Sequence, residues 1–156
     1  MYNARKFVKE SYDENDSFGR EIMIEVLKAR GYNVLEKPED FGIDLVAERS
    51  GVVEFFEVEV KHNYPWNSRD DFPFDTVSFL GRKKKWEEDN FWYCIICAET
   101  KAIIIANSKG IYKEEYAEIR NISTSQRNGK DKFYRVPKDK CWFVHYDTFI
   151  NGVQEV

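Results

Sequence analysis

Long apolar runs and cysteines are both scarce in this chain. No stretch of 18 apolar residues occurs, so we expect no membrane-spanning helix and no membrane partner. The basic residues Arg5 and Lys6 are followed by acidic residues rather than by the apolar segment of a secretory signal. The three cysteines are too few for a disulfide scaffold, and their odd number favours a reducing compartment. We therefore expect a cytoplasmic protein.

Two of the cysteines, Cys94 and Cys97, have the spacing of a zinc knuckle. They lie in the apolar run over residues 91–98, which predicts a buried strand. Residues three apart in a strand face opposite sides of the sheet. We therefore favour two small buried core residues over a zinc site.

Apolar and aromatic residues are plentiful. Of the 156 residues, 42% are hydrophobic, 16% aromatic and 33% charged, which is the composition of a folded domain. That length supports a single core without a separate recognition domain, so we expect one domain over residues 1–156.

The net charge of −4 argues, taken alone, against a nucleic-acid partner. However, the acidic excess lies in residues 1–60, and the rest of the chain is slightly basic. Most of this positive charge lies in two segments, which are either solvated faces or phosphate contacts. They are Arg82, Lys83, Lys84 and Lys85, and then Arg127, Lys130, Lys132, Arg135, Lys138 and Lys140.

A helix is predicted over residues 17–30, with Asp16 or Ser17 as its N-cap and Gly31 after its end. Apolar residues cover most of its circumference, and a narrow polar sector holds Glu21, Glu25 and Lys28. This sector is either a solvent-facing strip with a Glu25–Lys28 pair or a source of functional carboxylates.

Period-two patterns and turn residues predict the remaining elements. We expect strands over 32–35, 42–48, 55–61, 76–79, 91–98, 102–106 and 141–146, a hairpin turn at Ser50-Gly51, a surface loop over 62–73, helices over 82–90 and 112–119, and irregular structure over 121–140.

Gly42-Ile43-Asp44 and Glu59-Val60-Lys61 are the most informative segments. Alternation along the third strand places Glu57, Glu59 and Lys61 on one face, opposite Phe56, Val58 and Val60. Pairing of the second and third strands brings Asp44 near Glu59. Two carboxylates and a lysine can form a metal-dependent site that cleaves phosphodiesters. The alternative is an exposed strand edge with an ion pair.

This order of residues and elements resembles the PD-(D/E)XK nuclease superfamily, closest in pattern to Holliday-junction-resolvase-like and restriction-endonuclease-like members. Asp44, Glu59 and Lys61 match its motif, and Glu21 matches its helix carboxylate. The resemblance covers about residues 17–107, leaving a basic and strand extension over 108–156. It departs from the motif at Ile43, where proline is common, and at Glu57, an additional carboxylate.

The resemblance implies an α/β fold with a central mixed β-sheet flanked by helices, in the order α-β-β-β-α-β. It also implies a homodimer that cuts two DNA strands. Asp44 and Glu59, with the Val60 carbonyl, would bind Mg²⁺ or Mn²⁺, because these ions prefer oxygen ligands. Lys61 would position water or stabilise charge, and Glu21 would act through an outer-shell water or a second metal ion.

Substrate contacts are predicted around this site. Arg82 and Lys83 would hold phosphates beside the cut, and Lys84 and Lys85 would lie further out. Tyr64 and Trp66 either stack on an unpaired base or pack beneath their loop. His62 either assists Lys61 or is incidental, and His145 is a core or surface residue. The second basic segment supplies Arg127, Lys130 and Lys132 as further nucleic-acid contacts.

We expect a Mg²⁺-dependent endonuclease that acts on branched or structured DNA. A sequence-specific restriction-type enzyme and an RNA-processing enzyme remain alternatives, because the metal chemistry does not distinguish sugars. A non-catalytic nucleic-acid-binding or protein-binding module on the same fold is the rival from another class.

Overall fold

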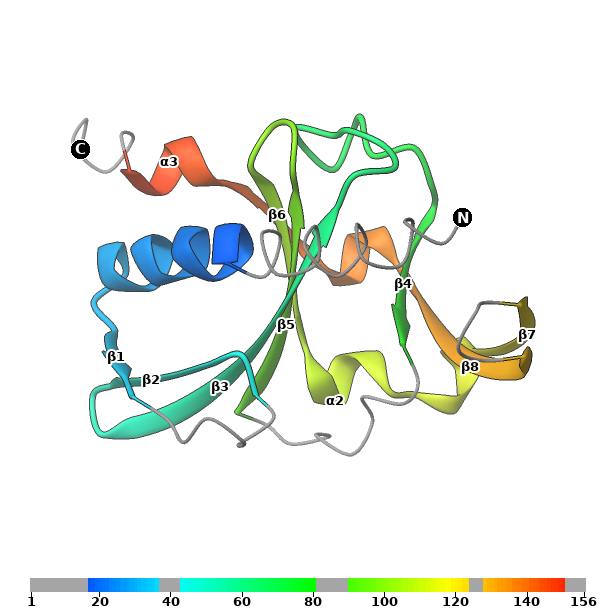
Figure 1. Cartoon of the computed structure of the whole chain (residues 1–156), viewed down its shortest axis with the longest axis horizontal. Helices are drawn as coiled ribbons and strands as arrows, with labels where there is room; N and C mark the ends of the chain where they lie inside the picture. The colour runs from blue at the N-terminus through cyan, green and yellow to red at the C-terminus, as the bar shows by residue number, and fades with distance from the viewer. Residues whose placement is uncertain (1–16, 37–42, 81–89, 124–127, 151–156) are drawn as a thin grey trace, which may run out of the picture.

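The computed structural model describes residues 17–36, 43–80, 90–123 and 128–150. The fold is α/β, with two sheets and a helix over residues 17–29 (Figure 1). One sheet has the order β1-β2-β3-β5-β6-β9 and the other has the order β4-β8-β7. The strands are β1 Asn33–Leu35, β2 Leu45–Arg49, β3 Val52–Lys61, β4 Thr76–Leu80, β5 Phe91–Cys97, β6 Ala102–Asn107, β7 Ala117–Ser123, β8 Asn128–Pro137 and β9 Trp142–His145.

The larger sheet is mixed, as expected. β3 pairs with β5 in parallel, whereas the other pairs of this sheet are antiparallel. Ser50 and Gly51 form the expected turn between β2 and β3, with positive φ angles of 56° and 81° that suit a tight hairpin.

The helix over residues 17–29 covers one face of this sheet (Figure 1). It buries Ile22, Met23, Val26 and Leu27 and is followed by Gly31, whose φ of 88° ends the helical path. The predicted polar sector of Glu21, Glu25 and Lys28 is exposed. Glu25 accepts a hydrogen bond from the Tyr146 hydroxyl at 2.9 Å, so this strip contacts α3 (Tyr146–Ile150).

Two cores lie on opposite faces of the larger sheet. Cys94 belongs to the core beneath the 17–29 helix, and Cys97 belongs to the core shared with the second sheet. Both thiols are buried and neither forms a disulfide. The prediction that they are small core residues on opposite faces is confirmed.

The second sheet corrects two predictions. The expected helix over 112–119 is wrong, because the chain forms α2 (Ser108–Ile111), η2 (Glu114–Tyr116) and then β7. The predicted irregular structure over 121–140 is also wrong in the part that is described, because β7 extends to Ser123, β8 pairs with it from Asn128 to Tyr134, and η3 (Lys138–Lys140) follows β8. Tyr134 and Val136 are buried while Arg135 is exposed, which is a strand's alternation. The density of charge on the solvent face obscured this period in the sequence.

This second sheet, rather than helices alone, covers the other face of the larger sheet. Val77 and Phe79 of β4 and Tyr134 of β8 share a core with Phe91 and Tyr93 of β5. The predicted helix over 82–90 falls almost entirely on residues 81–89, which lie outside the described residues.

None of the helices in the described part of the chain combines the length and apolar composition that crossing a membrane requires.

Gly19 lets the 17–29 helix approach β3 closely. A Cβ at this position would lie 2.8 Å from Val60 Cγ2 and 2.9 Å from Val58 Cγ1. Valine side chains are stiff about χ1, so they cannot easily move aside. We expect Gly19→Ala to lower the free energy of unfolding by about 1–2 kcal/mol, because overpacking outweighs the helix propensity gained. Urea denaturation measures the change.

Gly110→Ala is the matched control, since it lies in α2 and a Cβ there would have no neighbour within 4 Å. We expect this variant to be neutral or up to about 1 kcal/mol more stable. Equal or greater stability of Gly19→Ala than wild type would contradict the close approach.

Candidate active site

Asp44 lies on the bend before β2 and completes the pairing of that strand with β3. Leu45 is opposite Phe56, and beyond this pair the Val58 amide donates to Asp44 Oδ2 at 2.8 Å. The carboxylate thus replaces a backbone acceptor where the β2 ladder begins. This contact fixes the Asp44 carboxylate beside the backbone of β3, one residue before Glu59.

The Val60 carbonyl faces the same edge of β3 as Asp44. Backbone groups of alternate residues in a strand point to opposite neighbours. Val58 directs its amide to the β2 side, whereas Lys61 directs its carbonyl to the β5 side and accepts from the Ala98 amide at 3.0 Å. Val60, two residues after Val58, therefore presents its carbonyl on the β2 side.

Glu59 and Lys61 form an ion pair on the face of β3 that is turned away from the 17–29 helix. Lys61 Nζ lies 2.9 Å from Glu59 Oε2, and the two side chains are 27% and 45% exposed, respectively. The expected side-by-side arrangement is therefore present, and the pair is accessible to a ligand. An exposed ion pair contributes little to stability, so its presence alone does not assign a function.

Lys61 remains protonated at neutral pH. Burial disfavours the ammonium ion, but the negative charge of Glu59 and its hydrogen bond outweigh this effect and raise the pKa of Lys61. A lysine held in its charged form can stabilise negative charge or orient water, but it is poorly suited to accept a proton.

Glu57 differs from Glu59 in its environment. Its side chain is only 5% exposed and lies opposite Tyr93 in the β3–β5 register. Burial, the hydrogen bond from the Tyr112 hydroxyl and the charge of Glu57 together raise the pKa of Tyr93. Because its side chain is 45% exposed, Glu59 is more accessible to an external ligand than the buried Glu57.

The structure places Glu21 on the other side of the sheet from Glu59 and Lys61. Glu21 is exposed on the 17–29 helix, whose contact at Gly19 is with Val58 and Val60. Asp44 thus contacts β3 at Val58, one residue before Glu59, whereas Glu21 does not join Glu59 and Lys61 on their face.

The predicted stacking residues have different environments. Trp66 is 1% exposed and packs edge-on against Phe72, with ring centroids 5.5 Å apart, so its ring belongs to the core and is closed to a base. Tyr64 is half-buried beside Trp66, at a centroid distance of 5.9 Å. His62 is exposed, and the half-buried His145 lies 3.8 Å from Asp147.

The predicted phosphate contacts are largely beyond what the structure describes. Arg82 to Lys85, Arg127 and the Lys130 side chain lie outside the described residues. Lys132 is paired with Glu114 at 3.6 Å and lies 5.4 Å from the centre of the Tyr134 ring.

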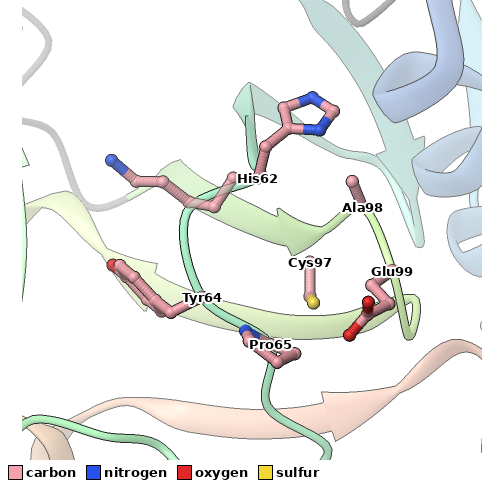
Figure 2. Close-up of a pocket in the computed structure, with 7 residues that line it drawn as sticks. His62, Tyr64, Pro65, Cys97, Ala98 and Glu99 are labelled. Carbon is pink, nitrogen blue, oxygen red and sulfur yellow. The ribbon is translucent and has the colours of Figure 1, made fainter.

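A pocket adjoins Lys61 that the sequence did not reveal (Figure 2). Its volume is about 270 Å³, and it lies where β3 and β5 end together. Pockets often occur at the carboxyl ends of parallel strands. Only knowledge that β3 and β5 are parallel neighbours would have located it. Lys61, His62, Tyr64, Pro65, Cys97, Ala98 and Glu99 line the pocket.

The donor set of this site suits a magnesium ion better than a softer metal. In the described part of the chain, no three His, Cys, Asp or Glu side chains cluster as a metal cage. Mg²⁺ typically uses one or two carboxylates, with waters and substrate phosphates completing its octahedron. Asp44, Glu59 and the Val60 carbonyl are oxygen donors of the kind that this ion takes.

The contact between Asp44 and Val58 predicts a structural role for this carboxylate that can be separated from chemistry. Asp44→Ala leaves the Val58 amide without its acceptor, so we expect a loss of about 1–3 kcal/mol in the free energy of unfolding. Asp44→Asn retains a carbonyl acceptor and should lose less. Urea denaturation of both variants tests this order.

Asp70→Ala, at an exposed position in the loop between β3 and β4, serves as the control and should change stability by less than about 0.5 kcal/mol. If Asp44→Ala were as stable as this control, the contact with Val58 would not support the strand.

No known family model matches the sequence, and no curated protein matches it either. The function of the site must therefore be inferred from its geometry and chemistry.

Proposed function

We propose that this protein is a Mg²⁺-dependent endonuclease that hydrolyses DNA phosphodiester bonds at the ends of β2 and β3. The observation that carries the proposal is that Asp44 is hydrogen-bonded to β3 at Val58, one residue before Glu59 of the Glu59–Lys61 pair. Asp44 Oδ2 accepts a hydrogen bond from the Val58 amide at 2.8 Å. Glu59, the residue after Val58, lies 2.9 Å from Lys61 Nζ through its Oε2 atom.

The order of elements supports the same proposal. A helix precedes three antiparallel strands, β1, β2 and β3, and the next strand of the sheet, β5, runs parallel to β3. This is part of the order that the resemblance to the PD-(D/E)XK nuclease superfamily implies, and the helix expected before β5 falls almost entirely on residues outside the described part of the chain. The resemblance would also make the protein a homodimer.

The residues can divide the work of hydrolysis between them. Asp44, Glu59 and the Val60 carbonyl would hold the ion. When bound, Mg²⁺ neutralises charge on the phosphate and makes a coordinated water more acidic. Lys61, kept cationic by Glu59, would stabilise the charge that develops on the phosphate oxygens and orient the attacking water.

The direct test is cleavage of labelled single-stranded, duplex and branched DNA and one RNA, with Mg²⁺ or Mn²⁺. We expect cleavage by wild type and none by Asp44→Asn, which keeps the acceptor for Val58 but loses the charge. Asp147→Asn, an exposed aspartate on α3, is the matched control and should cleave as wild type does. Cleavage that survives Asp44→Asn unchanged would overturn the site assignment.

A separate prediction concerns Lys61. Lys61→Ala removes a positive charge from the phosphate without removing a metal ligand, so we expect Mg²⁺ binding to persist while kcat falls by about 10²–10³. Calorimetry measures Mg²⁺ binding, and steady-state cleavage measures kcat. Lys28→Ala, an exposed lysine on the 17–29 helix, should leave both unchanged. Loss of metal binding in Lys61→Ala would instead indicate a structural role.

The same experiments distinguish the rival binding module. A non-catalytic binder would show DNA affinity that falls with salt and no cleaved product with either ion. Product from RNA but not from DNA would favour the RNA-processing alternative.

A further inference from the structure

Hydrogen bonds join the two segments that form the pocket beside Lys61. Thr100 donates from its hydroxyl to the Trp66 carbonyl at 2.6 Å, which ties the loop after β3 to the turn after β5. The Ala98 amide donates to the Lys61 carbonyl at 3.0 Å and closes the end of the strand pair. These bonds hold the two walls of the pocket together.

Tyr64 forms a fixed aromatic wall. Its ring packs edge-on against Phe72 and Phe74, with centroid distances of 5.7 Å and 4.9 Å. Burial and the charge of Glu59 raise the pKa of Tyr64, against the opposing effect of Lys61, so the phenol keeps its proton at neutral pH. It therefore offers both a flat surface and a hydrogen-bond donor.

The two ends of the pocket differ in charge. Lys61 provides a cation next to the proposed scissile phosphate. Figure 2 shows Tyr64 and Glu99 on opposite sides of Cys97, with Pro65 between them. Glu99 is exposed, and an ionised carboxylate only accepts hydrogen bonds. The pocket thus has a cationic and aromatic end and an acceptor end, with Cys97 between them.

We propose that this pocket receives an unpaired nucleobase next to the scissile phosphate, with its N–H groups directed at Glu99. Unpaired bases are typically recognised by stacking on aromatic rings and by hydrogen bonds to their Watson–Crick edge. The volume of about 270 Å³, just below the range of about 300–1,000 Å³ common for ligand pockets, is sufficient for one base.

Two consequences follow for the substrate. A base inside a duplex cannot enter such a pocket without leaving its stack, so the substrate class is single-stranded or locally unpaired DNA. Guanine offers two adjacent N–H donors on its Watson–Crick edge and best matches a carboxylate. This inference rests on the proposed function for its placement beside the cut, but base binding itself does not require cleavage.

The test is a titration without divalent ions, monitored by the changes in the amide NMR chemical shifts of Tyr64, Ala98 and Glu99. The probes are dGMP, dAMP, dTMP, 2-deoxyribose 5-phosphate and inorganic phosphate. We expect dGMP to bind most tightly and the two probes without a base to cause no shift at Ala98 and Glu99. Equal shifts with 2-deoxyribose 5-phosphate, or none with any nucleotide, would overturn the proposal.

Two glutamate variants make the test specific. Glu99→Gln should weaken dGMP binding about tenfold, because it loses one charge-assisted hydrogen bond. Glu115→Gln, an exposed glutamate on η2, is the matched control and should bind as wild type does. Unchanged dGMP affinity in Glu99→Gln would contradict the proposal that Glu99 accepts hydrogen bonds from the base.

Cleavage separates this inference from the proposed function. If both hold, Glu99→Gln lowers the ratio of single-stranded to duplex cleavage about tenfold. Cleavage that depends on Asp44, with a ratio unchanged in Glu99→Gln, would contradict the base pocket and leave the nuclease intact. Base binding without any cleavage would contradict the nuclease and leave the pocket intact.

Discussion

The period-two alternation of β3 is the constraint on which the site depends. β3 pairs with β2 on one side and β5 on the other, so its side chains can only point to the two faces of the sheet. Packing places Phe56, Val58 and Val60 on the face covered by the 17–29 helix. Gly19 has no side chain, so the helix can approach this face closely. Glu59 and Lys61 are consequently held together on the other face.

Asp44, immediately before β2, adds the third group of the proposed site. A strand that stops pairing leaves a backbone donor to satisfy, and the Asp44 carboxylate satisfies it at Val58. The same carboxylate is the proposed metal ligand, so one residue serves both the fold and the chemistry. The parallel pairing of β3 with β5 then ends both strands together and opens the pocket beside Lys61.

The sequence predicted the elements whose pattern is local. The 17–29 helix, the hairpin at Ser50-Gly51 and the alternation that pairs Glu59 with Lys61 follow from neighbouring residues alone. The β7–β8 strand pair was missed because the many charged residues on its solvent face obscure the alternation of buried residues in the sequence. Burial of Trp66 and the pocket at Cys97 depend on contacts between distant segments, which no local pattern contains.

Localising a paramagnetic ion tests the central claim most directly. Mn²⁺ added at substoichiometric concentration broadens amide signals near its binding site. The account predicts selective broadening at Val58, Glu59 and Val60 in wild type and its loss in Asp44→Asn, with Asp147→Asn unchanged. Broadening confined to other acidic surfaces, or identical broadening in Asp44→Asn, would contradict a metal-dependent active site at the ends of β2 and β3.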